Sequence, residues 1–152
     1  MKTSLLAILG LAVAIGSTSS FGQDSVHSLN GVWRAIEGNV ILGRGVINTI
    51  PDNYDEWQVT ISDQQGAVFK ATQTVKPKSG TPTGKYGEAP MTGQTTPLIG
   101  AVDGTGSYLM MVDIEDTTTF RCNVVNDETM RCILAEPGKN AVAGFALMKR
   151  AE

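Results

Sequence analysis

Several residues that commonly perform chemistry are scarce in this sequence. It contains one histidine, His27, and two cysteines, Cys122 and Cys132, among 152 residues, and its aromatic content is 6%. Two thiolates and one distant imidazole cannot complete a tetrahedral metal site. Nucleophilic catalysis usually needs a base beside the nucleophile, and His27 lies near the start of the expected mature chain, where chain ends are normally loose. We therefore expect no metal ion, no cofactor and no catalytic residue.

Charged residues are also few, and both signs are interspersed. They make up 18% of the chain, with a formal net charge of -3 and no run of like sign. Recognition of nucleic acid or of an anionic membrane surface depends on a basic stripe, which this linear order lacks. The carboxylates Glu37, Glu56, Asp103, Asp113 and Asp116 mostly fall at expected strand ends or turns, which is typical of solvated side chains rather than of an acid/base pair. The sequence thus predicts neither a nucleic-acid partner nor an enzyme.

Long hydrophobic runs are absent apart from one near the N-terminus. Lys2 precedes an apolar run from Leu5 to Ile15, and small residues follow as far as Gly22. At about eleven residues the run is too short for the roughly 20 needed to span a bilayer, and the layout is typical of a secretory signal peptide. We expect cleavage after residues 1–22, no lipid anchor because no cysteine lies at the junction, and a single periplasmic or secreted domain of residues 23–152 without membrane insertion.

The two cysteines are placed to form a disulfide. Cys122 and Cys132 are equally distant from Asp127, which lies in a turn-like segment. If residues 118–125 and 130–136 pair as antiparallel strands around this turn, the two cysteines are directly opposed, with Cβ atoms close enough for a bridge. An exported protein meets the oxidising conditions that a disulfide needs. Two free thiols or a redox pair are the alternatives, although there is no Cys-x-x-Cys spacing.

From Leu29 onward, hydrophobic and polar residues alternate with the period of a β-strand, and turn residues return at short intervals. Trp57, Val59 and Ile61, for example, share one face of an expected strand. The pattern predicts strands over residues 29–36, 40–47, 57–61, 67–75, 97–102, 107–112, 118–125, 130–136 and 141–150. Turns or loops are expected at Gly38–Asn39, 51–56, 62–66, Asp103–Gly104 and Pro137–Gly138.

Short links between consecutive strands predict an all-β fold, an antiparallel up-and-down β-barrel of about eight strands. Closure removes the two unpaired edges that an open meander would leave; a β-sandwich is the alternative. Residues 76–96 form the longest connection and are rich in proline and glycine. A loop of this length is either functional, for instance as a lid, or locally mobile.

The two ends of this domain resemble those of a known superfamily. Leu29-Asn30-Gly31-Val32-Trp33 opens the first strand with Gly-x-Trp, and Lys149-Arg150 ends the last strand. This is similar to the calycin superfamily, which comprises lipocalins, fatty-acid-binding proteins and avidins. The resemblance implies structural roles for Gly31, Trp33 and Arg150: the tryptophan closes one end of the barrel and the guanidinium packs across its ring. The biotin site of avidins draws on several tryptophans, whereas this chain has two, so the resemblance is stated for the superfamily only.

These features favour an exported lipocalin/avidin-like barrel that binds a small, partly apolar ligand. Such a protein should contain a cavity of about 300 Å³ or more. The expected lumen residues are Phe69, Leu109, Met111, Phe120, Met130 and Leu134. The alternative is a protein-interaction module, such as a secreted protease inhibitor or an assembly partner, that uses loop 76–96.

Overall fold

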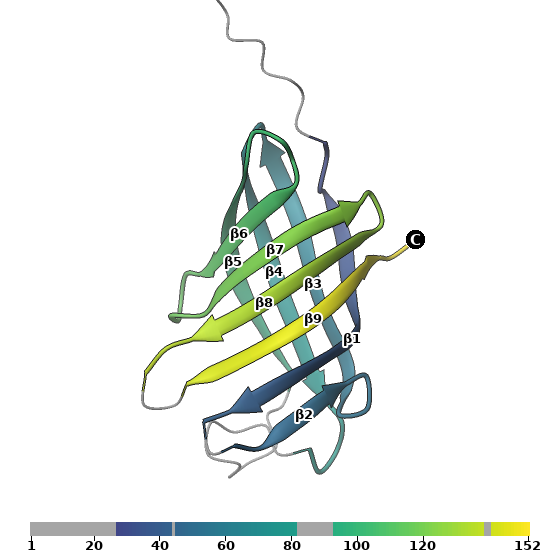
Figure 1. The fold of residues 1–152 in the computed structure, drawn as a ribbon, viewed down its shortest axis with the longest axis vertical. Coiled ribbons are helices and arrows are strands. Elements are labelled where there is room, and N and C mark those ends of the chain that lie inside the picture. The colour runs from purple at the N-terminus through teal and green to yellow at the C-terminus, as the bar shows by residue number, and fades with distance from the viewer. Residues whose placement is uncertain (1–26, 44, 82–92, 139–140) are drawn as a thin grey trace, which may run out of the picture.

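The computed structural model describes residues 27–43, 45–81, 93–138 and 141–152, which form nine β-strands (Figure 1). Residues 1–22, the expected signal peptide, lie outside these ranges. The strands are β1 (Gly31–Leu42), β2 (Ile47–Ile50), β3 (Tyr54–Gln65), β4 (Val68–Pro77), β5 (Gln94–Val102), β6 (Tyr108–Asp113), β7 (Thr119–Asn126), β8 (Thr129–Glu136) and β9 (Val142–Arg150). Within the described ranges, no helix is long and apolar enough to cross a membrane.

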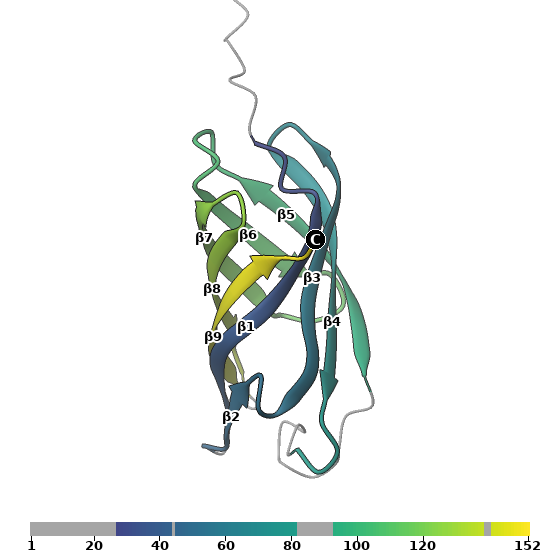
Figure 2. The ribbon, with the colours of Figure 1, turned by 90° about the vertical axis from the view of Figure 1, so that its right-hand side faces the viewer.

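The strands form a closed antiparallel barrel, which confirms the predicted fold class. All nine belong to one sheet, in the order β2-β1-β3-β4-β5-β6-β7-β8-β9, and β1 also pairs with β9. That last pairing closes the ring through eight strands and leaves β2 as an addition. The ladder between β1 and β9 runs from Trp33 opposite Arg150 to Leu42 opposite Val142. Figures 1 and 2 show the strands inclined to the long axis around a common interior, and no second stacked sheet is present among them.

Two strands share one edge of β1. Residues 31–34 of β1 pair with β3, and residues 38–41 pair with β2. The short strand β2 therefore completes the edge of β1 where β3 no longer pairs with it. This arrangement is found at the lower end of the barrel in Figure 1, where β2 is labelled.

The core follows directly from the alternation in the sequence. Inward positions on opposing walls are buried, whereas their neighbours along each strand face solvent. Trp57, Val59 and Ile61 are all buried on one face of β3, as predicted. The largest fully buried side chains are those of Trp33, Ile61, Leu98, Leu109, Met111, Met130, Met148, Val40, Val59, Asn48 and Cys122.

The predicted turn at Gly38–Asn39 is wrong, because β1 continues through both residues. A Cβ atom at position 38 would lie 2.2 Å from the carbonyl oxygen of Phe145 on β9. Gly38 therefore permits a close approach of two backbones, a role of glycine within strands. A register shift between Ala35 and Glu37 accompanies it. The chain reverses later, where Gly45 has a φ of +81° and donates to the carbonyl of Leu42.

Other predicted boundaries also differ from the structure. The expected strand 40–47 is divided, since residues 40–42 belong to β1 and Ile47 begins β2. Residues 54–56 belong to β3 rather than to the expected loop 51–56, and β3 continues to Gln65 rather than ending before 62–66. A register shift between Ser62 and Gln65 includes Asp63, whose φ is +52°. The polar residues that suggested a turn therefore form a bulge, which lets a strand bend without ending.

The predicted hairpins on the other side of the barrel are present. In the β5–β6 connection, Asp103 accepts hydrogen bonds from the backbone of Ser107 and Tyr108 at 3.0 and 3.1 Å. In the β7–β8 hairpin, Cys122 is directly opposite Cys132. The structure joins these two cysteines in a disulfide with a Cα–Cα distance of 4.0 Å, as the sequence predicts.

Candidate ligand-binding site

One end of the barrel is closed by Trp33. Its side chain is completely buried, and its indole Nε1 donates to the carbonyl of Leu29 at 2.9 Å. The guanidinium carbon of Arg150 lies 4.7 Å from the centroid of the Trp33 ring. The Nη2 atom of the same guanidinium donates to the carbonyl of Ser28 at 2.9 Å. Gly31 has a φ of +139°, a conformation that only glycine adopts readily. These contacts tie the first and last strands together at this end.

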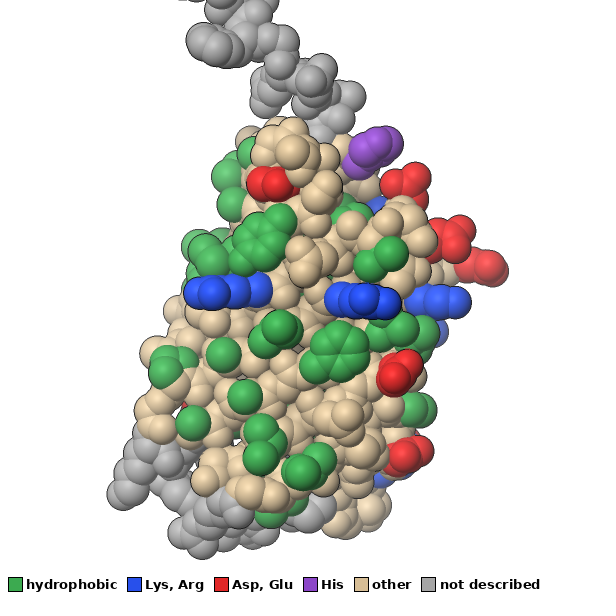
Figure 3. Space-filling model, in the orientation of Figure 1, with side chains coloured by type: hydrophobic (Ala, Val, Ile, Leu, Met, Phe, Trp, Pro, Cys, Tyr) green, Lys and Arg blue, Asp and Glu red, His purple; other side chains and the backbone are tan. Residues whose placement is uncertain are grey.

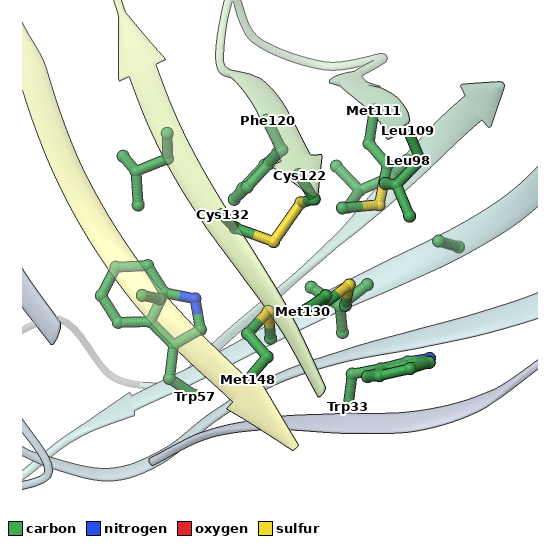
Figure 4. Packing of buried hydrophobic residues seen from close by; sticks show 14 of the residues in the cluster. Trp33, Trp57, Leu98, Leu109, Met111, Phe120, Cys122, Met130, Cys132 and Met148 are labelled. Atoms are coloured by element: carbon green, nitrogen blue, oxygen red, sulfur yellow. A yellow bond between two sulfur atoms is a disulfide. The ribbon is translucent and has the colours of Figure 1, made fainter. Parts of the chain in front are cut away.

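The middle of the barrel is filled by its own side chains. Leu109, Met111 and Met130 are completely buried, and the disulfide belongs to the same buried cluster (Figure 4). Phe69 is 4% exposed, and its ring lies against Gly100, where a Cβ atom would be 2.3 Å from two ring carbons. The middle layer is therefore a packed core.

A cavity occupies the opposite end, where these inward side chains stop. Its volume is about 160 Å³. The apolar part of its wall comprises Val40, Leu42, Tyr54, Trp57, Val75, Pro77, Phe120, Leu134 and Val142, and the polar part comprises Gln73, Gln94, Thr96, Asp113, Asp116, Thr118 and Glu136. The rings of Tyr54 and Trp57 meet edge to face at a centroid distance of 5.0 Å. The cavity thus combines an aromatic wall with a polar rim.

Tyr54 is held in place by a buried amide. The side chain of Asn48, on β2, is 1% exposed and its Nδ2 donates to the Tyr54 hydroxyl at 3.3 Å. Burial raises the pKa of Tyr54 above its ordinary value of 10.0, and the hydrogen bond from Asn48 offsets part of that rise. Tyr54 therefore offers a neutral phenol to the cavity at physiological pH. The added strand β2 contributes to the site through this contact.

The rim of the cavity is acidic. Asp113 accepts hydrogen bonds from the backbone of Glu115 at 2.8 Å and of Asp116 at 3.1 Å. The hydroxyl of Thr118 donates to Glu136 at 3.4 Å. Nowhere in the described ranges do three His, Cys, Asp or Glu side chains come close enough to hold a metal ion together. The rim instead presents carboxylate acceptors that can hydrogen-bond a polar group.

The cavity lining includes two of the six expected lumen residues, Phe120 and Leu134. Leu109, Met111 and Met130 belong to the packed middle layer instead. Sequence reasoning missed Trp57 and Tyr54 as lining residues. The alternation did place Trp57 on an inward face, but it could not tell which end of the barrel stays open.

The predicted loop 76–96 is shorter in the structure, because β4 continues to Pro77 and β5 begins at Gln94. Both of its ends lie at this cavity. Pro77, Gln94 and Thr96 line it. The backbone of Lys78 and the hydroxyl of Thr81 both donate to the carbonyl of Asn53, at 2.9 and 3.0 Å. These bonds fix the first part of the connection against the β2–β3 turn. Residues 82–92 lie outside the described ranges.

Comparison with known proteins supports the fold alone. No protein-family model matches the chain, and no curated protein matches it significantly. It is similar to the solved structure of a redesigned β-barrel, with a TM-score of 0.50, 8% sequence identity, and coverage of 82% of this chain and 92% of the other. A closed eight-stranded antiparallel barrel is consistent with a calycin-like fold.

Proposed function

We propose that this chain is an exported, calycin-like protein that binds a small, partly apolar ligand at the open end of its barrel. The observation that carries the proposal is the cavity lined by Tyr54 and Trp57. An apolar wall with a few polar groups at one side is the usual composition of a small-molecule site. Among the described residues that line the cavity there is no histidine, cysteine or serine, and we therefore propose binding rather than catalysis.

The size of the cavity limits the ligand. Its 160 Å³ is about half the volume that we expected from the sequence, and it is close to that of a cavity that accommodates benzene. The proposed ligand is therefore a single ring, a short chain, or the end group of a larger molecule. The carboxylates of Asp113, Asp116 and Glu136 on the rim favour a polar end that donates hydrogen bonds or carries a positive charge.

Two features support export. The run from Leu5 to Ile15 has the length and flanking residues of a signal peptide, and a disulfide between Cys122 and Cys132 suits an oxidising compartment such as the periplasm or the extracellular space. Mass spectrometry of the protein from its own host would test cleavage, because the mature chain should begin near Gln23.

The two tryptophans allow a direct test of ligand binding. Trp57 lines the cavity, whereas Trp33 lies at the closed end. In a Trp33→Phe variant the fluorescence reports on the cavity, and in a Trp57→Phe variant it reports on the closed end. We expect benzylamine to change the emission of Trp57 in the Trp33→Phe variant and not the emission of Trp33 in the Trp57→Phe variant. Toluene and benzoate should change the emission of Trp57 progressively less than benzylamine does. Absence of binding by all three probes would contradict the proposal.

A variant that fills the cavity provides the control. Val142 lines the cavity and is half-buried, so Val142→Phe should occupy part of the space and weaken benzylamine binding about tenfold or more. Ile133→Phe adds a ring on the outer face, where Ile133 is 61% exposed, and should leave binding unchanged. Equal binding by both variants would place the ligand elsewhere.

The second candidate function is a protein-interaction module. A hollow of about 490 Å³ on the outer face is lined mainly by apolar residues, among them Val68, Ile99, Ala101 and Met110. Exposed apolar patches of this kind often mark interaction sites. The module would use this hollow, the loop 76–96, or both. Replacing residues 82–92 by a short Gly-Ser linker tests the loop, because retained capture of a partner would exclude it as the contact.

A further inference from the structure

Four basic side chains form a row around the outer face of the barrel. They are Arg121 on β7, Arg131 on β8, Lys149 on β9 and Arg34 on β1, and all four are exposed. Arg131 lies opposite Asn123, two residues from Arg121, and Lys149 lies opposite Thr129, two residues from Arg131. Lys149 is directly opposite Arg34. Figure 3 shows Lys and Arg side chains at one level across the face formed by β7, β8 and β9.

Acidic residues are few beside the row: Glu37 lies in the ladder, and Glu128 lies in the β7–β8 turn, where its carbonyl accepts a hydrogen bond from the backbone of Arg150, next to Lys149. The other side chains directly opposite its members are Met110, Ile133, Asn123, Leu147, Thr129 and Gln58, none of which is charged. In the described part of the chain, the two salt bridges join Lys70 to Asp63 and Lys76 to Glu56. Glu37 is the acidic residue nearest to the row in the ladder, opposite Leu147.

The direct pairing of Arg34 with Lys149 works against stability. Like charges at directly opposed positions of an antiparallel ladder are destabilising. The row therefore concentrates positive charge on a protein whose net charge is negative. An anionic partner would remove this repulsion and gain charge-assisted hydrogen bonds from the guanidinium groups.

The shape of the row indicates which anion fits. It crosses four neighbouring strands, and so it runs around the barrel rather than along it (Figure 3). A flat bilayer touches a cylinder along its axis and would meet only part of the row. A flexible chain can follow the curve. Two exposed aromatic side chains flank the row, Tyr108 opposite Asn123 and Phe145 opposite Ile133, so stacking does not distinguish a polysaccharide from single-stranded nucleic acid. The proposed export favours the polysaccharide, because an exported protein is separated from cellular nucleic acid.

We propose that this row binds a linear acidic polysaccharide through its carboxylate or sulfate groups. The site is separate from the cavity, since none of the four residues lines it. Its existence does not depend on the ligand at the open end, although an extracellular or periplasmic polysaccharide presupposes the proposed export. Spaced anionic groups of such a chain would pair with successive members of the row.

Binding of a size-defined heparin octasaccharide, measured by calorimetry, tests the proposal. The triple variant Arg121→Gln/Arg131→Gln/Lys149→Gln should bind about tenfold more weakly or worse, because three charge-assisted contacts are lost. The matched control is Lys70→Gln/Lys76→Gln/Lys78→Gln, which removes the same charge elsewhere and should change affinity by less than about twofold. Glu37→Gln should strengthen binding. For the unmodified protein, log K should fall with log salt with a slope of roughly -2 to -3, as expected for three or four contacts.

Each other outcome overturns the proposal. An equal loss in the two triple variants would mean that overall charge, not the row, attracts the anion. Tighter binding of an oligodeoxynucleotide with the same number of charges would point to nucleic acid, and binding restricted to phosphatidylglycerol vesicles would point to a membrane. Thermal melts of both triple variants establish that they fold, which is expected because every substituted side chain is exposed.

Discussion

Trp33 and Trp57 both face the barrel interior, yet their surroundings give them different roles. Trp33 is completely buried, with its indole nitrogen hydrogen-bonded and a guanidinium over its ring. Trp57 is 8% exposed and lines the cavity beside Tyr54. Sequence reasoning could identify the first because Gly31 and Arg150 accompany it in a recognisable pattern. No such pattern accompanies Trp57. It lines the cavity only because the inward side chains around it leave the space beside its ring unfilled.

The contact between Arg150 and Trp33 should contribute measurably to stability. Arg150→Ala removes a cation–π contact and the hydrogen bond to Ser28, and we expect it to lower the free energy of unfolding by about 1–3 kcal/mol. Arg150→Lys keeps the charge but loses the planar head, so its loss should be smaller. Urea denaturation of both variants provides the measurement. A change within experimental error for Arg150→Ala would show that Trp33 closes the barrel unaided.

Tyr54 should make stability depend on pH in the alkaline range. Its folded-state pKa is raised above 10.0, chiefly by burial, so the unfolded chain loses this proton at a lower pH than the folded protein does. The contribution to stability is therefore fully present below pH 10 and is lost as the pH rises through the raised pKa. Ultraviolet titration of tyrosinate absorbance should show a late-ionising group that is missing in Tyr54→Phe. A Tyr54→Phe variant with the same titration curve would contradict this.

At the scale of single strands, glycine is ambiguous because turns and close backbone contacts both require it. Gly38 resembled a turn residue, but the structure places it in the β1–β9 ladder. Gly38→Ala would bring a Cβ atom to 2.2 Å from the carbonyl of Phe145, and we expect it to destabilise the protein by about 1–3 kcal/mol or more. Gly104→Ala is the matched control, since no atom lies within 4 Å of its added Cβ. Equal melting temperatures for the two variants would contradict the close approach.

The basic row illustrates what linear order cannot reveal about neighbouring strands. Arg34, Arg121, Arg131 and Lys149 are far apart in the sequence, so no basic stripe is visible there. Arg121 and Arg131 share a hairpin with the two cysteines, but Lys149 and Arg34 join them only through the register of β9 with β8 and with β1. A register shift of one residue would send each of them to the opposite face. The pairing of Cys122 with Cys132 could be predicted because a short hairpin fixes its register locally.

For the whole molecule, alternation and short connections predicted the closed barrel, because from β3 to β9 each strand pairs with the next strand along the chain. The same pattern separated the two faces of each strand, as for Trp57, Val59 and Ile61 on β3. Whether the interior is filled or hollow depends on how side chains from opposite walls meet. Met111, Met130 and Met148 are buried in the packed part of the interior, whereas the side chains around Val142 leave a cavity. The two-residue alternation of hydrophobic and polar residues does not reveal this difference in packing.

A closed ring of strands should also tolerate circular permutation, in which the old chain ends are joined and new ends are made elsewhere. The two ends of the described chain lie together at the closed end, where Arg150 bonds to Ser28 and the backbone of Ala151 donates to Val32 at 2.7 Å. A short linker from Glu152 to His27, with the chain opened between Gly104 and Thr105, keeps every strand and all inward contacts. We expect this permuted protein to fold with the same disulfide and to lose at most about 2 kcal/mol of stability, as measured by circular dichroism and urea denaturation. Opening the chain instead between Arg131 and Cys132 cuts through the ladders of β8 with β7 and β9, and this control should not fold. If the first permuted protein also fails to fold, the order of the strands along the chain, and not the closed ring alone, determines the native state.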